Sequence, residues 1–243
     1  MMAAHFRHVL RYSGAGVAGL ALLGSLAGCG TSSAASSVTG EPTVTIGYQN
    51  GSDPQTVAIE QGFFQKDLHA HVHLKYFSSG PDALTAMASG TLDFMTGLGS
   101  PPVVAAIAKK VPLKIIWIQD RYATAEGLVV KNSSGIASLK NLEGKTVALV
   151  AGSTSPWELD TALTMQHIPL SSVHIDNTAP ANMVAAWKTG QIDAAYVWSP
   201  FLNLMQKDGG HIVVYDQNQV KTAPNFTVAV VNASFAKKYP QLV

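Results

Sequence analysis

The stretch Thr146-Val-Ala-Leu-Val-Ala-Gly-Ser-Thr-Ser-Pro156 joins an apolar strand to a helix through a turn of small polar residues. The β-branched and apolar residues of Thr146–Val150 predict a strand. Gly152–Ser155 are turn residues, and Pro156 suits the first turn of a helix that we expect to extend to about Gln166. Units of this strand–turn–helix kind are typical of α/β proteins.

The first half of the chain contains a matching unit. A strand is predicted over Leu92–Met95, a turn over Gly97–Ser100 and a helix from Pro101 to Lys110. Strands and helices also alternate elsewhere, which favours an α/β fold of two lobes with mainly parallel sheets. Further strands are predicted at 44–48, 72–77, 113–118, 127–130, 173–175, 192–197, 211–215 and 226–231, and further helices at 54–64, 83–89, 180–189 and 199–207.

One of these predicted strands is apolar along most of its length. Leu113–Ile118 is an apolar run apart from Lys114. Such a run is typical of a parallel strand that is buried on both faces of a sheet. We therefore expect this strand to lie inside its sheet.

The N-terminal segment has the pattern of an export signal. Arg7 and Arg11 precede an apolar stretch over Ala15–Leu26, and Leu26-Ala-Gly-Cys29 ends it with the only cysteine of the chain. This ending resembles the lipobox of bacterial lipoproteins. The alternative is a free cysteine that packs as a small hydrophobe, although a core cysteine has no reason to follow this pattern.

The lipobox resemblance implies a location. Residues 1–28 would be a signal peptide that is removed, and Cys29 would carry the lipid. Residues 29–42 are rich in Ser, Thr, Ala and Gly and predict a flexible tether. The mature protein would then be extracytoplasmic and anchored to a membrane rather than spanning it.

The composition excludes several classes of function. The 243 residues are 47% hydrophobic and 13% charged, with a formal net charge of +1. A near-neutral chain is unsuited to nucleic acid, and its apolar content argues against disorder. Since Cys29 is the only cysteine, the mature domain has no internal disulfide.

Two turns are candidates for an anion site. A turn of Gly, Ser and Thr at a helix start gathers unpaired backbone N–H groups and hydroxyls, and these bind an anion without a cation. Gly99 and Ser100 form such a turn in the first half, and Ser153, Thr154 and Ser155 form one in the second. The alternative is that these residues only cap their own helices. Because no Lys or Arg lies in either turn, a phosphate or polyanion is disfavoured.

Four segments of the chain resemble a known family, the substrate-binding proteins of taurine and alkanesulfonate ABC transporters. The resemblance runs from about Thr43 to Val243, and Ala185–Pro200 is its most specific part. The segments are Gly97-Leu-Gly-Ser-Pro-Pro102, Leu139-Lys-Asn-Leu-Glu-Gly-Lys145, Ala185-Ala-Trp-Lys-Thr-Gly-Gln-Ile-Asp-Ala-Ala-Tyr-Val-Trp-Ser-Pro200 and Lys207-Asp-Gly-Gly210.

This resemblance implies a type II periplasmic-binding fold, in which two lobes joined by two crossover strands close on a ligand. Lobe 1 would hold residues 43–125 together with 228–243, and lobe 2 would hold 130–223. The crossovers would lie near 126–128 and 224–227. Family members are usually longer, so we expect C-terminal helices to be missing here.

The resemblance also implies the function and the ligand. The protein would capture a small anionic organosulfonate as a monomer, without a cofactor, and deliver it to an ABC permease. Glu126 would pair with the ammonium of an aminosulfonate such as taurine, and Trp198 would contact a short alkyl chain. Gln49 and Ser52, after the first strand, are further candidate contacts.

Alternatives remain for these residues and for the ligand. Glu126 would otherwise be a surface or hinge carboxylate, and Trp198 a core residue, as we expect for Trp157 and Trp187. The Pro224-Asn225-Phe226 segment stands where relatives carry an acidic residue, which weakens the taurine assignment and leaves alkanesulfonates open. Nitrate, a pyrimidine precursor and an aromatic sulfonate are other ligand classes.

An enzyme on this fold is the alternative of a different class. The serines lie in turns without a paired histidine, so no nucleophile–base arrangement is evident. His69, His71 and His73 alternate along a strand, but no fourth metal ligand accompanies them. We therefore expect neither catalysis nor a metal site.

Overall fold

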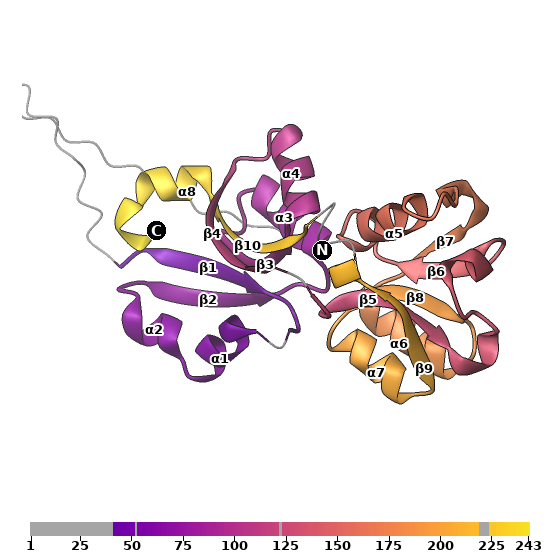
Figure 1. Ribbon diagram of the computed structural model, residues 1–243. Helices are drawn as coiled ribbons and strands as arrows, with labels where there is room; N and C mark the ends of the chain where they lie inside the picture. The colour runs from indigo at the N-terminus through magenta and orange to yellow at the C-terminus, as the bar shows by residue number, and fades with distance from the viewer. Residues whose placement is uncertain (1–40, 52, 122, 219–223) are drawn as a thin grey trace, which may run out of the picture. The chain divides into compact units, whose positions relative to one another are not determined.

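Two β-sheets, each covered by helices, make up the described part of the chain (Figure 1). The computed structural model describes residues 41–51, 53–121, 123–218 and 224–243. The elements of the first sheet and its helices are called lobe 1, and those of the second sheet are called lobe 2.

Lobe 1 contains five strands and five α-helices in the described residues, and lobe 2 contains five strands and three α-helices. Lobe 1 consists of β1 (Thr43–Tyr48), α1 (Pro54–Glu60), α2 (Phe63–Asp67), β2 (His71–Tyr76), α3 (Gly80–Ala88), β3 (Phe94–Gly99), α4 (Ser100–Ala108), β4 (Leu113–Arg121), β10 (Phe226–Asn232) and α8 (Ala233–Lys238). Lobe 2 consists of β5 (Glu126–Lys131), β6 (Thr146–Leu149), α5 (Ser155–Thr164), β7 (His174–Asn177), α6 (Pro180–Lys188), β8 (Ala194–Trp198), α7 (Phe201–Lys207) and β9 (Gly210–Tyr215). Short 3-10 helices are η1 (Asn132–Ser134), η2 (Leu139–Leu142), η3 (Leu170–Ser172), η4 (Asp216–Asn218) and η5 (Pro240–Leu242).

The two sheets have the same topology. Their strand orders are β2-β1-β3-β10-β4 and β7-β6-β8-β5-β9. In each sheet the first three strands pair in parallel, and β10 or β5 then pairs antiparallel with both of its neighbours. The predicted α/β fold is confirmed: in each sheet four strands run in one direction, and the sheet is mixed because β10 or β5 runs against them. The reason is that β5 and β10 each follow a connection from the other lobe and run against their neighbours.

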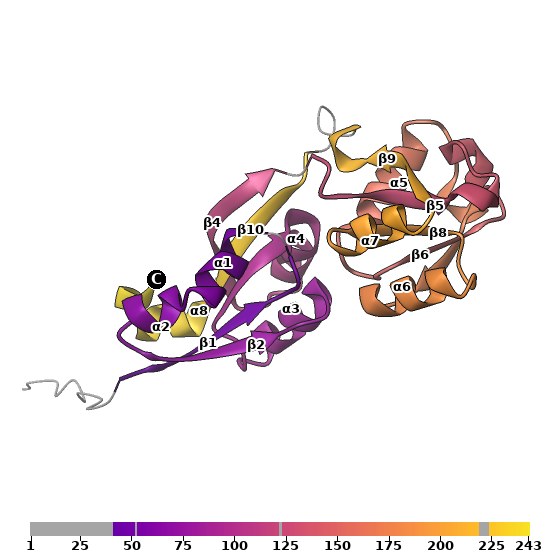
Figure 2. The ribbon, with the colours of Figure 1, turned by 90° about the horizontal axis from the view of Figure 1, so that it is seen from below.

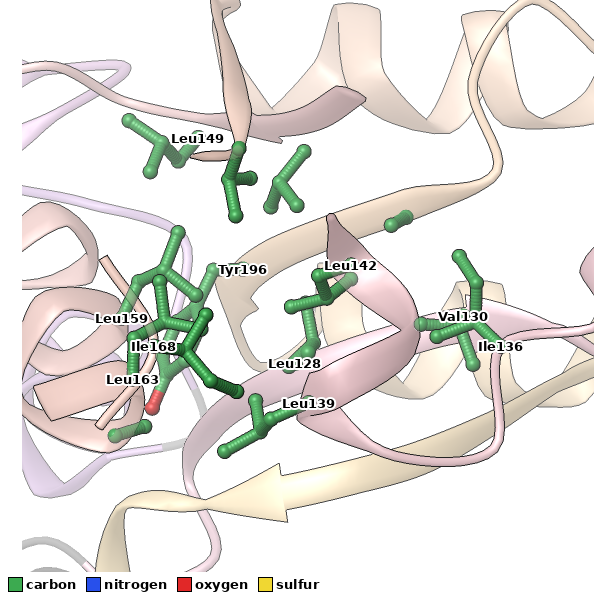
Figure 3. Close-up of a cluster of buried hydrophobic side chains, with 14 residues drawn as sticks. Leu128, Val130, Ile136, Leu139, Leu142, Leu149, Leu159, Leu163, Ile168 and Tyr196 are labelled. Carbon is green, nitrogen blue, oxygen red and sulfur yellow. The ribbon is translucent and has the colours of Figure 1, made fainter. Parts of the chain in front are cut away.

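The central strands of lobe 2 are apolar on both faces because each face packs under helices. Leu128 and Val130 lie in one core with Leu163 of α5, and this core is drawn in Figure 3. Val129 points to the opposite core, together with Trp187 of α6. Successive strand residues point to opposite faces of a sheet, so an uninterrupted apolar strand fills two cores.

Lobe 1 has the same layered arrangement. One core holds residues of α3 and α4, including Met87 and Val103, against Met95 of β3. The other core holds Phe94 and residues of α2 and α8, such as Phe235. Figure 2 shows α3 and α4 on one side of this sheet and α1, α2 and α8 on the other.

The prediction for Leu113–Ile118 was wrong in its partners and burial. This segment belongs to β4, an edge strand that pairs antiparallel with β10. Ile116 is 41% exposed, Trp117 56% and Ile118 59%. An apolar run does not distinguish an inner strand from an edge strand, because it carries no information on which strands flank it.

The predicted helix over 54–64 is divided in two. Asp53 caps α1 by accepting a hydrogen bond from the Thr56 N–H at 2.8 Å. Gly62 then adopts a φ of 66°, a left-handed conformation that ends the helical path before α2 begins.

Among the described residues, no helix combines the length and apolarity needed to cross a membrane.

Candidate functional site

A cavity of about 570 Å³ is lined by residues of both lobes. Most lining segments follow the end of a strand, where α/β sheets commonly bind ligands. From lobe 1 and the connection after β4 the lining includes Gln49, Asn50, Gly51, Asp53, Gly80, Thr96, Gly97, Leu98, Gly99, Pro102, Asp120, Arg121, Ala123, Thr124, Ala125 and Thr227. From lobe 2 it includes Glu126, Ser153, Thr154, Trp198, Ser199, Asn203 and Tyr215.

Gln49 lies on the lobe 1 side of the cavity. Its Nε2 donates to the Gly97 carbonyl at 3.3 Å, while the Gly97 N–H donates to Gln119 Oε1 at 2.7 Å. Gln49 Oε1 is buried and has no partner in the described residues. An acceptor left without a donor in a cavity is suited to a ligand N–H.

Glu126 lies on the lobe 2 side, at the start of β5. The residue is 1% exposed. Ser155 Oγ donates to Glu126 Oε1 at 2.5 Å, and Thr154 Oγ1 donates to Glu126 Oε2 at 2.6 Å. The turn that we considered for an anion therefore holds a carboxyl group of the protein itself.

Burial changes the ionisation of Glu126. Desolvation is the largest effect and raises the pKa of Glu126 to about 7 from its ordinary value of 4.5. The hydroxyls of Ser155 and Thr154 oppose this change because they stabilise the charged form, and Asp216 adds to it by repulsion. A carboxyl with this pKa responds strongly to a cation placed beside it.

The other predicted turn residues are engaged within the protein. Ser153 Oγ donates to the Val150 carbonyl at 2.8 Å, and Ser100 Oγ donates to Asn225 Oδ1 at 2.9 Å. Gly99 lines the cavity, but Ser100 and Ser155 do not. Whether Gly99, Ser100, Ser153, Thr154 or Ser155 contacts a ligand stays a prediction.

The tryptophans take different positions. Trp198 is partly buried, lines the cavity and is the register partner of Glu126 between β5 and β8. Trp187 is 1% exposed and belongs to the lobe 2 core, as predicted. Trp157 is partly buried and does not line the cavity.

Asp120 and Arg121, which were not predicted from the sequence, line the cavity at the end of β4. Asp120 Oδ1 accepts a hydrogen bond from Thr227 Oγ1 at 2.6 Å. Arg121 carries the one positive charge among the described lining residues. The signal in the sequence was the position of these two charged residues, directly after a predicted apolar strand and before a predicted crossover.

The lobes also approach each other beside the cavity. Gly152, in the turn before α5, has a φ of 76°, and a Cβ at this position would lie 3.6 Å from Pro81 Cγ. Pro81 is in the first turn of α3 in lobe 1. Gly80 and Ser153, the neighbours of these two residues, line the cavity.

Two predicted residues, Ser52 and Cys29, lie outside the described residues. Within the described part of the chain, no group of three or more His, Cys, Asp or Glu residues is arranged to hold a metal ion.

The cavity thus presents opposite charges to a ligand. Glu126 offers a buried carboxyl, Gln49 offers an unpaired acceptor, and Arg121 offers a guanidinium. Such a set suits a small molecule that carries both an ammonium and an acidic group.

The sequence of this chain matches a known family of proteins and several known relatives. Residues 42–243 match the family described as the substrate binding domain of ABC-type glycine betaine transport system. The chain is 37% identical over 202 residues to the taurine-binding periplasmic protein of Escherichia coli, covering 82% of this chain and 62% of that protein. This chain therefore spans less than two thirds of the length of that relative.

Solved structures share the architecture. The alkanesulfonate-binding protein SsuA of Xanthomonas axonopodis pv. citri, bound to MOPS, has a TM-score of 0.71 at 22% identity, covering 83% of this chain and 70% of that one. The periplasmic aliphatic sulphonate binding protein SsuA of Escherichia coli has a TM-score of 0.67 at 23% identity, covering 82% and 68%. With the family match over most of its length, the chain belongs to the substrate-binding proteins of ABC transporters.

Proposed function

We propose that this protein is an extracytoplasmic receptor that captures a small aminosulfonate such as taurine and delivers it to an ABC permease. It would act as a monomer and release its ligand unchanged. The taurine-binding relative, at 37% identity, supports both the ligand class and the location.

The observation that carries the proposal is the buried carboxyl of Glu126 in the cavity wall. A buried carboxylate is stabilised by a nearby cation, and the ammonium of taurine would supply one. The sulfonate at the other end of the molecule would face Arg121 and the neutral donors of lobe 1. Because the cavity takes residues from both lobes, a bound ligand would stabilise their closed arrangement.

Tryptophan fluorescence with taurine and ethanesulfonate tests this function, because Trp198 lines the cavity. We expect saturable changes with both ligands. In Glu126→Gln, the affinity for taurine should fall about tenfold or more, because a charge-assisted hydrogen bond is lost. The affinity for ethanesulfonate, which has no ammonium, should hold.

Glu143→Gln is the matched control, because Glu143 is exposed and does not line the cavity. It should bind both ligands like the wild type. The absence of a change with any sulfonate would sink the proposal, and unchanged taurine affinity in Glu126→Gln would remove the role of Glu126.

Alkanesulfonates without an amine are a second candidate ligand class. The observation that favours them is that both oxygens of Glu126 already accept hydroxyl hydrogen bonds, from Ser155 and Thr154. A carboxyl that is satisfied in this way does not require an ammonium. Tighter binding of ethanesulfonate than of taurine would select this class.

We further propose that Cys29 anchors the protein through a lipid. The support is the Leu26-Ala-Gly-Cys29 segment after an apolar stretch. Cell fractionation tests the anchor. The wild type should sediment with membranes, and Cys29→Ser, which cannot carry the lipid, should not. Mass spectrometry of an unmodified N-terminal peptide from the membrane fraction would contradict it.

A further inference from the structure

Three carboxyl groups are buried close together where the connections between the lobes leave lobe 2. Glu126 at the start of β5 is 1% exposed, and both Glu158 of α5 and Asp216 of η4 are 0% exposed. Only Glu126 of these three lines the ligand cavity. Glu158 and Asp216 therefore have no direct role in binding a ligand in this cavity.

Glu126, Glu158 and Asp216, which we call the carboxyl cluster, differ in how many hydrogen bonds they accept. Glu126 accepts two hydroxyl hydrogen bonds, and Glu158 Oε1 accepts one from Asn225 Nδ2 at 2.7 Å. Glu158 Oε2 and both oxygens of Asp216 receive none from a donor group of the described residues. Glu158 and Asp216 are nevertheless within hydrogen-bonding reach of each other. Since a carboxylate cannot donate, that contact is a hydrogen bond only when one of the two acids carries a proton.

The surroundings of Glu158 favour such a proton. Burial is the largest effect and, with the negative charges of Glu126 and Asp216, raises the pKa of Glu158 well above its ordinary value. The Asn225 amide opposes the change and is, within the described part of the chain, the one donor that favours the charged form.

Among the described residues, the elements around the carboxyl cluster supply no compensating cation. Those packed on α5 include β5, β8 and η3. The titratable group on the cluster side of β5 is Glu126 itself, and Lys131 is at the opposite end of the strand. Strand β8 carries the phenol of Tyr196, β9 ends in the phenol of Tyr215 before Asp216, and η3 has no titratable side chain. No lysine, arginine or histidine of the described ranges is among the groups that act on Glu158.

Asn225 links the carboxyl cluster to lobe 1. Its Oδ1 accepts from Ser100 Oγ at 2.9 Å, and Ser100 Oγ accepts from the Phe226 N–H at 3.2 Å. Ser100 begins α4, and Phe226 begins β10. A continuous series of hydrogen bonds therefore runs from Ser100 of α4, through Asn225 just before β10, to Glu158 of α5.

We propose that Glu158 and Asp216 share one proton and act as positioning residues, which hold η4 against α5 and keep Glu126 in place for ligand. Loss of that proton at alkaline pH would leave neighbouring carboxylates with no cation from the described residues beside them, and their repulsion would separate η4 from α5. Ligand affinity would then fall, although neither residue lines the cavity. The expected change in ligand affinity rests on the proposed function, but the proton shared by Glu158 and Asp216 does not.

Glu158→Gln tests the shared proton directly. The Gln Nε2 would donate to Asp216 as the proton does, and its Oε1 would keep accepting from Asn225. Ethanesulfonate is the probe because it has no amine that titrates. At alkaline pH, above the pKa of about 7 of Glu126, we expect the wild-type affinity to fall about tenfold or more as pH rises and that of Glu158→Gln to change by less than about twofold.

Asp160→Asn is the matched control, because Asp160 lies on the same helix but is exposed. It should follow the wild-type pH profile. Equal pH profiles of the wild type and Glu158→Gln would overturn the proposal, as would a wild-type affinity that is independent of alkaline pH.

A ligand-free measurement separates this proposal from the proposed function. The thermal unfolding midpoint of the wild type should fall on going to alkaline pH, and that of Glu158→Gln should fall less. If no sulfonate binds but the midpoints differ in this way, the proposed function fails and the shared proton stands. If the midpoints fall equally, the shared proton is refuted.

Discussion

Asn225 connects three parts of the molecule with one neutral side chain. Its Nδ2 donates to Glu158 of α5, and its Oδ1 accepts from Ser100 of α4. The side chain is 0% exposed, so water cannot replace either partner. An amide supplies both a donor and an acceptor without adding charge to a region that already holds three acids.

Asn225→Ala should therefore destabilise the fold. Glu158 Oε1 and Ser100 Oγ each lose a buried partner, and we expect the free energy of unfolding to fall by about 2–4 kcal/mol. Urea unfolding measures the change. Asn182→Ala, at an exposed position of α6, should cost no more than about 0.5 kcal/mol. Equal costs for the two variants would show that the amide bonds do not stabilise the fold.

The sequence predicted some site residues and missed others for physical reasons. Glu126 was identified because it precedes an apolar strand at a predicted crossover. The signal for Glu158 was present but unused: it lies with Ser155, Leu159 and Ala162 on the buried face of α5, at helical spacing. Asp216 could not be found, because its burial depends on how the chain folds back after β9.

At the scale of elements, local patterns predicted where most strands and helices lie but not which strands are neighbours. The Thr146–Val150 prediction corresponds to β6, and the Phe226–Val231 prediction corresponds to β10. The antiparallel pairing of β10 with β3 and β4 joins segments more than 100 residues apart. Such pairing is set by tertiary packing, which the local periodicity does not encode.

The β4 edge leads to a prediction on surface properties. Ile116 and Ile118 expose 41% and 59% of their surface on an edge strand, where apolar side chains promote contact with other chains. The double variant Ile116→Lys, Ile118→Lys should bind less of an apolar dye and aggregate less on heating. Dye fluorescence and light scattering measure these two effects.

Leu204→Lys is the control for this change. Leu204 is 48% exposed but lies on helix α7 rather than on a sheet edge. It should reduce dye binding and aggregation less than the β4 variant does. If the two variants behave alike, the β4 edge has no special effect.

At the scale of the whole molecule, the buried acids set the response of stability to pH. Burial raises the pKa of Glu126 from 4.5 to about 7, so between these values the folded chain keeps a proton that the unfolded chain has released. The stability from this group is complete below about pH 4.5 and is lost as pH rises to about 7. The raised pKa values of Glu158 and Asp216 act in the same direction.

The free energy of unfolding should therefore fall by about 1.4 kcal/mol per pH unit for each proton retained in this range. Urea unfolding at a series of pH values measures the slope. Glu126→Gln, which cannot titrate, should have a shallower slope than the wild type. A stability that increases across this range in the wild type would contradict the assignment.

The central claim is that the two lobes close around a taurine-like ligand, and a cross-link between the lobes tests it most directly. Pro81 Cβ lies 4.0 Å from the position of a Cβ on Gly152, which is within the span of about 3.5–4.5 Å that a disulfide requires. Pro81→Cys and Gly152→Cys, combined with Cys29→Ser, would give a disulfide that locks the lobes. A side chain at the positive φ of Gly152 is strained whatever space surrounds it, so the reduced double variant is the control for that strain.

The measurement is the retention of radiolabelled taurine during dialysis of this variant, oxidised after loading. We predict that the oxidised protein retains taurine, that reduction releases it, and that protein oxidised before loading takes up little. Equal loss of taurine from the oxidised and reduced forms would contradict capture between the lobes.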